Sequence, residues 1–325
     1  MYPIFQSTQT IENQLVMSKS GIKVFAPATV ANLGCGFDIL GLALNEPGDE
    51  IIARKTESAG QVTITKITGA QGNLPYEPTK NTAGVAALAF LKKQRADFGL
   101  ELEIHKKMPI GSGLGSSSAS AVAAVVAANT FLKHPLHRRE LLPFAIAGEK
   151  VASGSAHADN VAPALIGGIV LARDVDDIHR IIPPKSLYVV VIYPKLQILT
   201  SEARAMLSDR VSLGEHIQQS ANLGGLILGF ERSDFPLIKR SLKDIIIEPQ
   251  RAELIPGFYD VKDAALVNGA LGCSISGAGP SLFALCENTF IANNVAQAMT
   301  QAFQKHKIES TPYISEVNKE GAKIF

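Results

Sequence analysis

The stretch Pro109-Ile-Gly-Ser-Gly-Leu-Gly-Ser-Ser-Ser-Ala-Ser-Ala121 decides how this chain folds and what it can bind. Glycine occupies every second position from Gly111 to Gly115, and because glycine has no Cβ, the backbone there can pass very close to a ligand. The Ala/Val-rich run at 119–132 predicts a buried helix after the loop, and the segment 100–106 predicts a strand before it. The loop therefore presents a helix N-terminus, with unpaired N–H groups and a partial positive charge, which is a binding site for phosphate.

Two common phosphate-binding motifs built on glycine do not fit this loop. No lysine follows the glycines, so it is not a G-x-x-x-x-G-K-[ST] loop, and the spacing is G-x-G-x-G rather than the G-x-G-x-x-G of dinucleotide sites. A flexible serine and glycine linker would lead into polar chain, whereas an apolar run follows here. We therefore expect backbone N–H groups and serine hydroxyls to hold the ligand.

The composition argues against several classes of protein. The 325 residues suffice for two domains of ordinary size, and a formal net charge of +1 gives no reason to expect a polyanion or a membrane surface as partner. Apolar runs are interrupted well before the roughly 20 residues that span a bilayer. The absence of tryptophan, and of aromatic residues interleaved with basic ones, argues against nucleic acid as a partner. The polar N-terminal segment 1–20 does not resemble a signal peptide.

Three cysteines, Cys35, Cys273 and Cys286, stand in neither metal-ligand nor disulfide spacing. Thiols scattered in this way are typical of a reducing compartment. We therefore expect a cytoplasmic protein without structural disulfides, in which Cys35 is a small packing residue.

Strand and helix signals alternate along the first half of the chain, and the pattern changes at Pro183-Pro184. We predict an N-terminal extension over residues 1–20, an N-terminal domain over 21–185 that contains the glycine loop, and a C-terminal domain over 186–325. The expected strands cover residues 22–25, 50–55, 62–68, 100–106, 165–172, 187–193, 272–276, 282–286 and 313–317. The expected helices cover residues 81–98, 119–132, 139–152, 258–268 and 291–305, with several more between 201 and 240. The C-terminal part follows the α+β pattern of a split β-α-β fold.

Two further segments place polar side chains in glycine-rich turns. The first motif, Ala26-Pro-Ala-Thr-Val-Ala-Asn-Leu-Gly-Cys-Gly-Phe-Asp-Ile-Leu-Gly41, contains one amide, Asn32, and one carboxylate, Asp38. The third motif, Ser274-Ile-Ser-Gly-Ala-Gly-Pro-Ser-Leu-Phe283, sets a glycine turn between two predicted strands. Taken singly, Asp38 is a typical turn or cap residue and the second turn is a typical β-turn.

In this order the three motifs resemble the signature motifs of the GHMP small-molecule kinases, over about residues 21–317. Within that superfamily, Gly148-Glu-Lys-Val-Ala-Ser-Gly-Ser-Ala-His-Ala-Asp-Asn-Val-Ala-Pro-Ala164 and Ile247-Glu-Pro-Gln-Arg-Ala-Glu-Leu-Ile-Pro-Gly257 resemble segments of the homoserine kinases. The resemblance implies an α+β, two-domain GHMP kinase fold. Its N-terminal β-α-β domain would carry the glycine-rich phosphate loop, and its C-terminal domain would be a ferredoxin-like split β-α-β unit. It also implies an active site between the domains and a homodimer.

The activity implied by the resemblance is ATP-dependent phosphorylation of the side-chain hydroxyl of L-homoserine, a step of threonine biosynthesis. A related GHMP kinase acting on mevalonate or a sugar is one alternative, although a mevalonate site has little use for groups that bind an amine. A non-catalytic, ligand-binding relative is another, and it predicts loss of the glycine loop, Asp38 or Glu149. All of these are present.

The same resemblance assigns the nucleotide and metal ligands. Magnesium is a hard cation that prefers oxygen ligands and takes few of them from protein. Ser117 and Glu149 are expected to supply them here. The ATP-binding residues are expected to be Pro109, Ile110, Gly111, Ser112, Gly113, Leu114, Gly115, Ser116, Ser117, Ser118 and Ala119.

L-Homoserine is a zwitterion with a hydroxyl at its far end, so its pocket needs both signs of charge. Arginine suits the carboxylate because it forms a planar bidentate pair, and Asn32 and Asp38 suit the amino end. By resemblance, the substrate-binding residues are Asn32, Asp38, His157, Asp159, Asn160, Arg204 and Arg251. Asp38 and Asn160 are the catalytic candidates, with Asn160 placed to hold the hydroxyl. Either Asp38 or the transferred phosphate takes the hydroxyl proton, and the residues leave both possibilities open.

Overall fold

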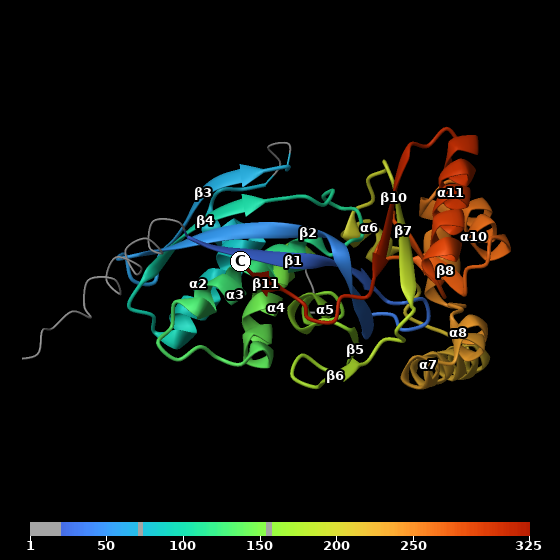
Figure 1. Cartoon of the computed structure of the whole chain (residues 1–325), viewed down its shortest axis with the longest axis horizontal. Helices are drawn as coiled ribbons and strands as arrows, with labels where there is room; N and C mark the ends of the chain where they lie inside the picture. The colour runs from blue at the N-terminus through green and yellow to red at the C-terminus, as the bar shows by residue number, and fades with distance from the viewer. Residues whose placement is uncertain (1–20, 71–73, 154–157) are drawn as a thin grey trace, which may run out of the picture.

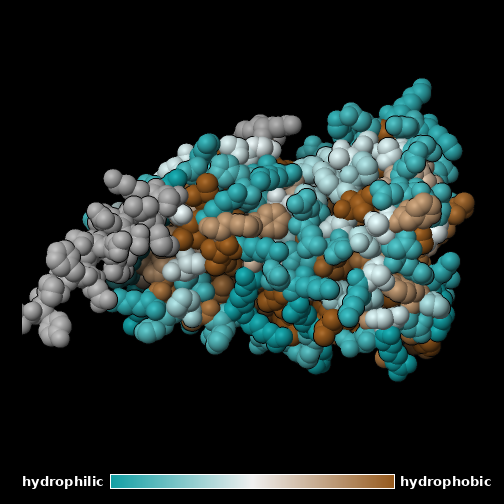
Figure 2. Space-filling view, viewed as in Figure 1, coloured by the Kyte–Doolittle hydropathy of each residue, from teal (hydrophilic) through white to brown (hydrophobic). Residues whose placement is uncertain are grey.

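The computed structural model of the chain describes residues 21–70, 74–153 and 158–325. Two sheets stand side by side, and each carries helices on one of its faces (Figure 1). The predicted substrate residue His157 lies outside the described residues. On the face seen in Figure 2, polar side chains lie between scattered apolar ones, as on an ordinary water-facing surface.

In the described part of the chain, the first sheet has seven strands in the order β11-β1-β2-β4-β3, with β5 paired to β2 and to β6. Its strands are β1 (Ile22–Ala31), β2 (Leu40–Thr56), β3 (Val62–Thr68), β4 (Gly99–His105), β5 (Ile169–Ala172), β6 (Ile178–Ile181) and β11 (Lys323–Ile324). The accompanying helices are η1 (Pro78–Lys80), α2 (Thr82–Gln94), α3 (Ser116–Thr130), η2 (Arg138–Leu141), α4 (Leu142–Ser153) and α5 (Val161–Ile166). Strands β3 and β4 run parallel and are joined through α2, which is the expected β-α-β unit.

The second sheet has the order β10-β7-β9-β8, and its pairs are antiparallel. Its strands are β7 (Tyr188–Pro194), β8 (Gly272–Ile275), β9 (Leu282–Cys286) and β10 (Ser310–Glu316). The helices of this half are α6 (Thr200–Ala205), α7 (Leu213–Arg232), α8 (Phe235–Ser241), α9 (Ile247–Arg251), η3 (Ala252–Leu254), α10 (Phe258–Val267) and α11 (Thr289–Lys305). This strand order, with helices between the first two strands and between the last two, is that of a split β-α-β unit, so the prediction is confirmed.

Each half has a core that follows from its sequence pattern. In β4 the side chains Leu100, Leu102 and Ile104 alternate onto the buried face, as the period of two in a strand requires. Helix α3 is buried on nearly all sides, because its alanines and valines let the sheet and the neighbouring helices α2 and α4 approach closely. A second core lies between α10, α11 and the second sheet.

Some predicted boundaries are wrong, and each error has a local cause. The segment 165–172 is not one strand, because Gly167 and Gly168 adopt positive φ angles of +71° and +81° and separate α5 from β5. The helix that begins after Asn81 ends at Gln94 rather than near 98, since Arg95 is left-handed. Asn81 does cap that helix, and its side chain accepts a hydrogen bond from the amide of Ala83 (3.1 Å).

The last strand is not the one predicted at 313–317. Strand β11 follows it and pairs with β1, so the C-terminal end of the chain returns to the first sheet. Within the described residues, every helix is too short or too polar to cross a membrane. The three cysteines are buried and unpaired, as expected, and Cys35 packs with its thiol toward the carbonyl of Ser241.

The third motif holds the glycine loop from the side of the second sheet. The Ser276 hydroxyl donates to the carbonyl of Gly113 (2.7 Å), and the amide of Ser281 donates to the carbonyl of Ser112 (3.2 Å). Gly113 has a φ of +80°, and a Cβ on it would lie 2.4 Å from the backbone oxygen of Ser276. Only glycine therefore lets the two turns touch.

Gly113→Ala should lower the free energy of unfolding by more than the cost of placing alanine in a left-handed conformation. Gly60→Ala is the matched control, because Gly60 has a φ of +72° with nothing within 4 Å of the added Cβ. We expect the control to lower the free energy of unfolding by about 1–2 kcal/mol, and Gly113→Ala to lower it clearly further, because backbone must move. Urea unfolding measures both, and equal losses would show that the close contact is unimportant.

Candidate active site

A cavity of about 400 Å³ opens between the two halves of the chain, within the size range of small-molecule sites. Segments distant in sequence line it, from all three motifs, from the start of α2 and from the ends of α6 and α9. The lining residues are Asn32, Asp38, Leu74, Pro75, Lys80, Asn81, Thr82, Ile104, Lys106, Ile110, Gly111, Ser112, Gly113, Leu114, Gly115, Ser116, Ser117, Ser120, Glu149, Val151, Asp159, Asn160, Thr200, Arg204, Arg251, Gly277, Ala278 and Gly279.

The glycine loop delivers the N-terminus of α3 to this cavity, as its sequence predicts. Gly111, Gly113 and Gly115 all have positive φ angles, of +68°, +80° and +68°. Gly115 occupies the N-cap position and has no side chain, so the N–H groups of the first helical turn are left for a ligand. The geometry is that of an anion site at a helix N-terminus.

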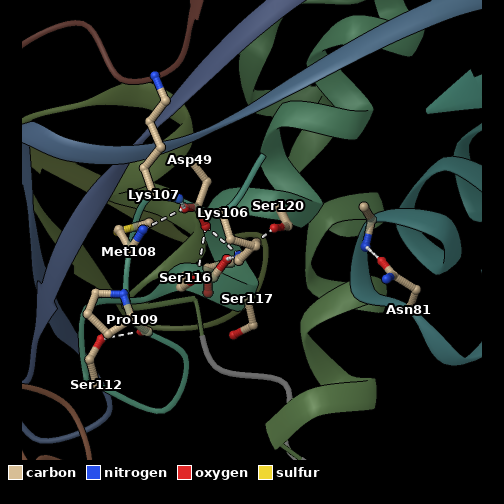
Figure 3. A network of polar contacts seen from close by, with 12 residues as sticks. Asp49, Asn81, Lys106, Lys107, Met108, Pro109, Ser112, Ser116, Ser117 and Ser120 are labelled. Carbon is tan, nitrogen blue, oxygen red and sulfur yellow. Dashed lines mark hydrogen bonds and ion pairs between the residues drawn. The ribbon is translucent and has the colours of Figure 1, made fainter. Parts of the chain in front are cut away.

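A buried ion pair between Asp49 and Lys106 holds both ends of the loop (Figure 3). At the start of the loop, one oxygen of Asp49 accepts from the amides of Lys107 (2.8 Å) and Met108 (3.1 Å). At its end, the other oxygen accepts from the hydroxyl of Ser116 (2.8 Å).

The ammonium of Lys106 completes this network from the cavity side. It donates to the carbonyl of Ser116 and to the hydroxyl of Ser120, both at 2.7 Å. Burial lowers the pKa of Lys106, and the negative charge of Asp49 opposes that change. Neither side chain is more than 3% exposed, so each charge depends on the other for its compensation.

Glu149 of α4 faces the first turn of α3. Its two carboxylate oxygens accept hydrogen bonds from the hydroxyls of Ser117 (3.0 Å) and Ser118 (2.9 Å). The residue is buried, and this burial raises the pKa of the carboxyl group. Ser117 and Glu149 therefore present oxygen atoms together at the phosphate end of the cavity.

On the opposite wall, Asn32 joins the first motif to the third. Its Nδ2 donates to the carbonyl of Gly277 (2.8 Å), and its Oδ1 accepts from the amide of Asp38 (3.0 Å). Both Asn32 and Asp38 are left-handed, with φ angles of 73° and 63°. Asp38 in turn forms a bidentate ion pair with Arg204, with distances of 2.8 and 3.1 Å.

Arg251 is the last residue of α9 and is only 4% exposed. Its Nε donates to the carbonyl of Ala203 and its Nη1 to that of Gly277, both at 3.0 Å. Burial lowers the pKa of Arg251, and the nearby charge of Arg204 lowers it further. Asp244 fixes the helix that carries this guanidinium, since its carboxylate accepts from the amide of Glu248 (3.0 Å) in the first turn.

Asp159 and Asn160 lie between these two ends of the cavity. The side-chain oxygen of Asn160 accepts from the hydroxyl of Thr29 (2.6 Å). Asp159 is buried, and burial, followed by repulsion from Asp38 and Glu149, raises its pKa to about 7.

The structure brings most of the predicted site residues to one cavity, but not all of them. Pro109, Ser118 and Ala119 do not line it; Ala119 is fully buried, and Ser118 is turned to Glu149. Sequence reasoning missed the lining residues Lys80, Thr82, Lys106 and Thr200, and it treated Asn81 only as a helix cap. Lys106 gave no signal, because a lysine at the end of a predicted strand is typical of a solvated position.

Comparisons with known proteins agree on one family. Residues 81–168 match the family profile described as "GHMP kinases N terminal domain", and residues 226–305 match "GHMP kinases C terminal". A homoserine kinase of Chlorobium phaeobacteroides (strain BS1) is 49% identical over 314 residues, covering 93% of this chain and 98% of that protein.

Solved structures give the same result. The crystal structure of homoserine kinase from Cytophaga hutchinsonii superimposes with a TM-score of 0.91 at 47% identity, covering 100% of both chains. The crystal structure of L. major mevalonate kinase in complex with R-mevalonate superimposes with a TM-score of 0.67 at 14% identity, covering 91% of this chain and 96% of that chain. The latter likeness concerns the fold alone. The predicted two-domain fold is confirmed.

Lys106→Met should destabilise the protein by about 3–5 kcal/mol, because it leaves the Asp49 carboxylate buried without its cation. The double variant Asp49→Asn/Lys106→Met should recover part of that loss. Lys195→Met, which breaks an exposed pair with Glu309, is the control and should cost less than about 1 kcal/mol. Urea unfolding compares the three, and a Lys106→Met loss as small as the control would contradict the role of the pair.

Asp159 should make stability depend on pH in a specific window. Its folded pKa of about 7 lies above the ordinary value of 3.8, so the folded state holds the proton more tightly than the unfolded chain. This contribution is complete below about pH 4 and is lost as the pH rises through 7. The difference in unfolding free energy between the parent and Asp159→Asn should therefore change between pH 4 and 7 and level off above. If the unfolding free energies of the parent and of Asp159→Asn changed in parallel with pH, the raised pKa of Asp159 would be contradicted.

Proposed function

The chain belongs to the homoserine kinases, a family within the GHMP kinases, and we propose that it transfers the γ-phosphoryl group of ATP to the side-chain hydroxyl of L-homoserine. The products are O-phospho-L-homoserine and ADP, and the reaction is a step of threonine biosynthesis. One observation supports the proposal independently of the relatives' names. A single cavity joins a phosphate-binding helix N-terminus to a pocket that holds two guanidinium and two carboxyl groups.

The nucleotide binds with its phosphates on the glycine loop. The N–H groups at the start of α3 have no side-chain cap, so they can donate to the phosphate oxygens. The Asp49–Lys106 pair fixes the loop before ATP binds, so the free energy of binding does not include the entropy cost of ordering the loop.

Ser117 and Glu149 fit a magnesium ion. They offer a hydroxyl and a carboxylate oxygen that already lie 3.0 Å apart, and hard oxygen ligands are those that Mg²⁺ prefers. A bound Mg²⁺ would neutralise negative charge on the phosphates as the phosphoryl group is transferred. Glu149 supplies the charge that attracts the ion, and Ser118 keeps the carboxylate aimed at the phosphate end.

The opposite wall suits a zwitterionic amino acid. Arg204 and Arg251 bind the carboxylate, while Asp38 and Asn32 bind the amino end. Asp159 adds a second carboxyl group to this pocket. His157 belongs to the same proposed set, although it lies outside the described residues.

Asn160 aims the hydroxyl. Its side chain is fixed by the hydrogen bond from Thr29 and lies beside Gly115, between the phosphate loop and the substrate pocket. Most of the catalysis then comes from positioning and electrostatics.

Asp38 orients the substrate rather than accepting its proton. Both carboxylate oxygens of Asp38 are engaged by Arg204, which suits a group that holds position. The hydroxyl proton passes to an oxygen of the transferred phosphoryl group as the new O–P bond forms and the bond to ADP breaks. We also propose a homodimer, because the family resemblance implies one, and a cytoplasmic location and domain boundaries at residues 20 and 185, which follow from the sequence pattern.

The substrate assignment is tested by ADP release from Mg-ATP with L-homoserine, D-homoserine, L-threonine, mevalonate and galactose offered in parallel. Turnover should be confined to L-homoserine. Arg251→Ala should lower kcat/KM by about 10²-fold or more, since it removes a buried charged donor, whereas the exposed Arg240→Ala should match the parent. Turnover of mevalonate or galactose instead would preserve the phosphate site but contradict the amino-acid pocket. ATP binding without turnover of any alcohol would favour a non-catalytic protein.

A further inference from the structure

We infer that Phe37 is a positioning residue that holds both arginines of the substrate pocket and so sets selectivity for a carboxylate-bearing alcohol. The inference rests on the proposed function and extends it. Phe37 lies next to Asp38 in the first motif, and no step of the proposed mechanism uses it.

The ring of Phe37 lies within cation–π distance of two guanidinium groups. The Cζ atom of Arg204 is 5.2 Å from the ring centroid, and that of Arg251 is 5.0 Å from it. Guanidinium groups are attracted to aromatic faces at these distances, and the attraction grows where water is partly excluded. Phe37 is half-buried and Arg251 is buried, so this condition holds for Arg251, whereas the side chain of Arg204 is 41% exposed.

The two arginines are like charges on one aromatic ring, and carboxylates lie near them. Burial and then the charge of Arg204 lower the pKa of Arg251, while the charges of Asp38, Asp244 and Asp159 raise it. They also come from separate short helices, α6 and α9. Arg251 donates to the carbonyl of Ala203 in α6 and to that of Gly277 in the turn of the third motif. A shared aromatic ring adds attraction to both cations without neutralising either.

The backbone on either side of Phe37 is held by Asn32. The amide of Gly36 donates to the carbonyl of Asn32 (2.9 Å), and the amide of Asp38 donates to the side chain of Asn32 (3.0 Å). Phe37 therefore sits between two residues fixed by one asparagine. The hydrocarbon ring adds no negative charge beside Arg251, whereas Arg204 is already paired with Asp38.

The experiment compares Phe37→Leu, which keeps the apolar bulk, with Phe37→Tyr, which keeps the π face. Phe131→Leu is the control, since Phe131 is also half-buried but its ring packs against Phe98 rather than against a guanidinium group. We expect Phe37→Leu to raise KM for L-homoserine by about three- to tenfold, with little change in kcat or in KM for ATP. Phe37→Tyr and Phe131→Leu should stay near the parent.

An alcohol without the carboxylate separates this role from a general structural one. The affinity for 3-amino-1-propanol, measured as a substrate or as a competitive inhibitor, should be the same in the parent and in Phe37→Leu. Two results would overturn this inference and leave the proposed function standing. One is an unchanged KM for L-homoserine in Phe37→Leu, and the other is an equal loss of affinity for 3-amino-1-propanol or ATP. A parent enzyme that does not phosphorylate L-homoserine would overturn the proposed function and this inference with it.

Discussion

Asp49 and Lys106 form a buried ion pair on which the geometry of the nucleotide site depends (Figure 3). Asp49 binds the chain where the glycine loop begins and again where α3 begins, so the span of the loop is fixed. A buried pair is seldom a net source of stability, but it is strongly selective for the one arrangement that satisfies both charges. Here that arrangement opens a helix N-terminus to a phosphate.

The substrate side is organised around one backbone atom, the carbonyl oxygen of Gly277. It accepts hydrogen bonds from Asn32 of the first motif and from Arg251 of α9. The neighbouring Ser276 binds Gly113 of the glycine loop, so the third motif ties the phosphate end of the cavity to the amino-acid end. The close approaches are made by glycines of the first two motifs. A Cβ on Gly41 would lie 1.7 Å from the backbone oxygen of Asp159, and one on Gly113 would lie 2.4 Å from that of Ser276.

Most of the fold and much of the site were predictable from sequence. The strands at 62–68 and 282–286 were predicted at their observed bounds. Each is a run rich in apolar or β-branched residues with turn-forming residues beside it. The short strand β11 was missed, since two residues carry no periodic signal and pair only through tertiary contact. Lys106 and Phe37 were missed for the same reason. Nothing next to them in sequence shows that one meets Asp49 and the other meets two arginines.

We infer that the phosphate loop is formed before any ligand binds. Hydrogen exchange of the amides of Lys107 and Met108 in the nucleotide-free protein measures this, because these N–H groups donate to the buried carboxylate of Asp49. We expect slow exchange without nucleotide, close to the rate of amides in the core strand β4, and little change when ATP is added. Fast exchange that slows only on addition of ATP would contradict it, and would mean that the nucleotide folds the loop around itself.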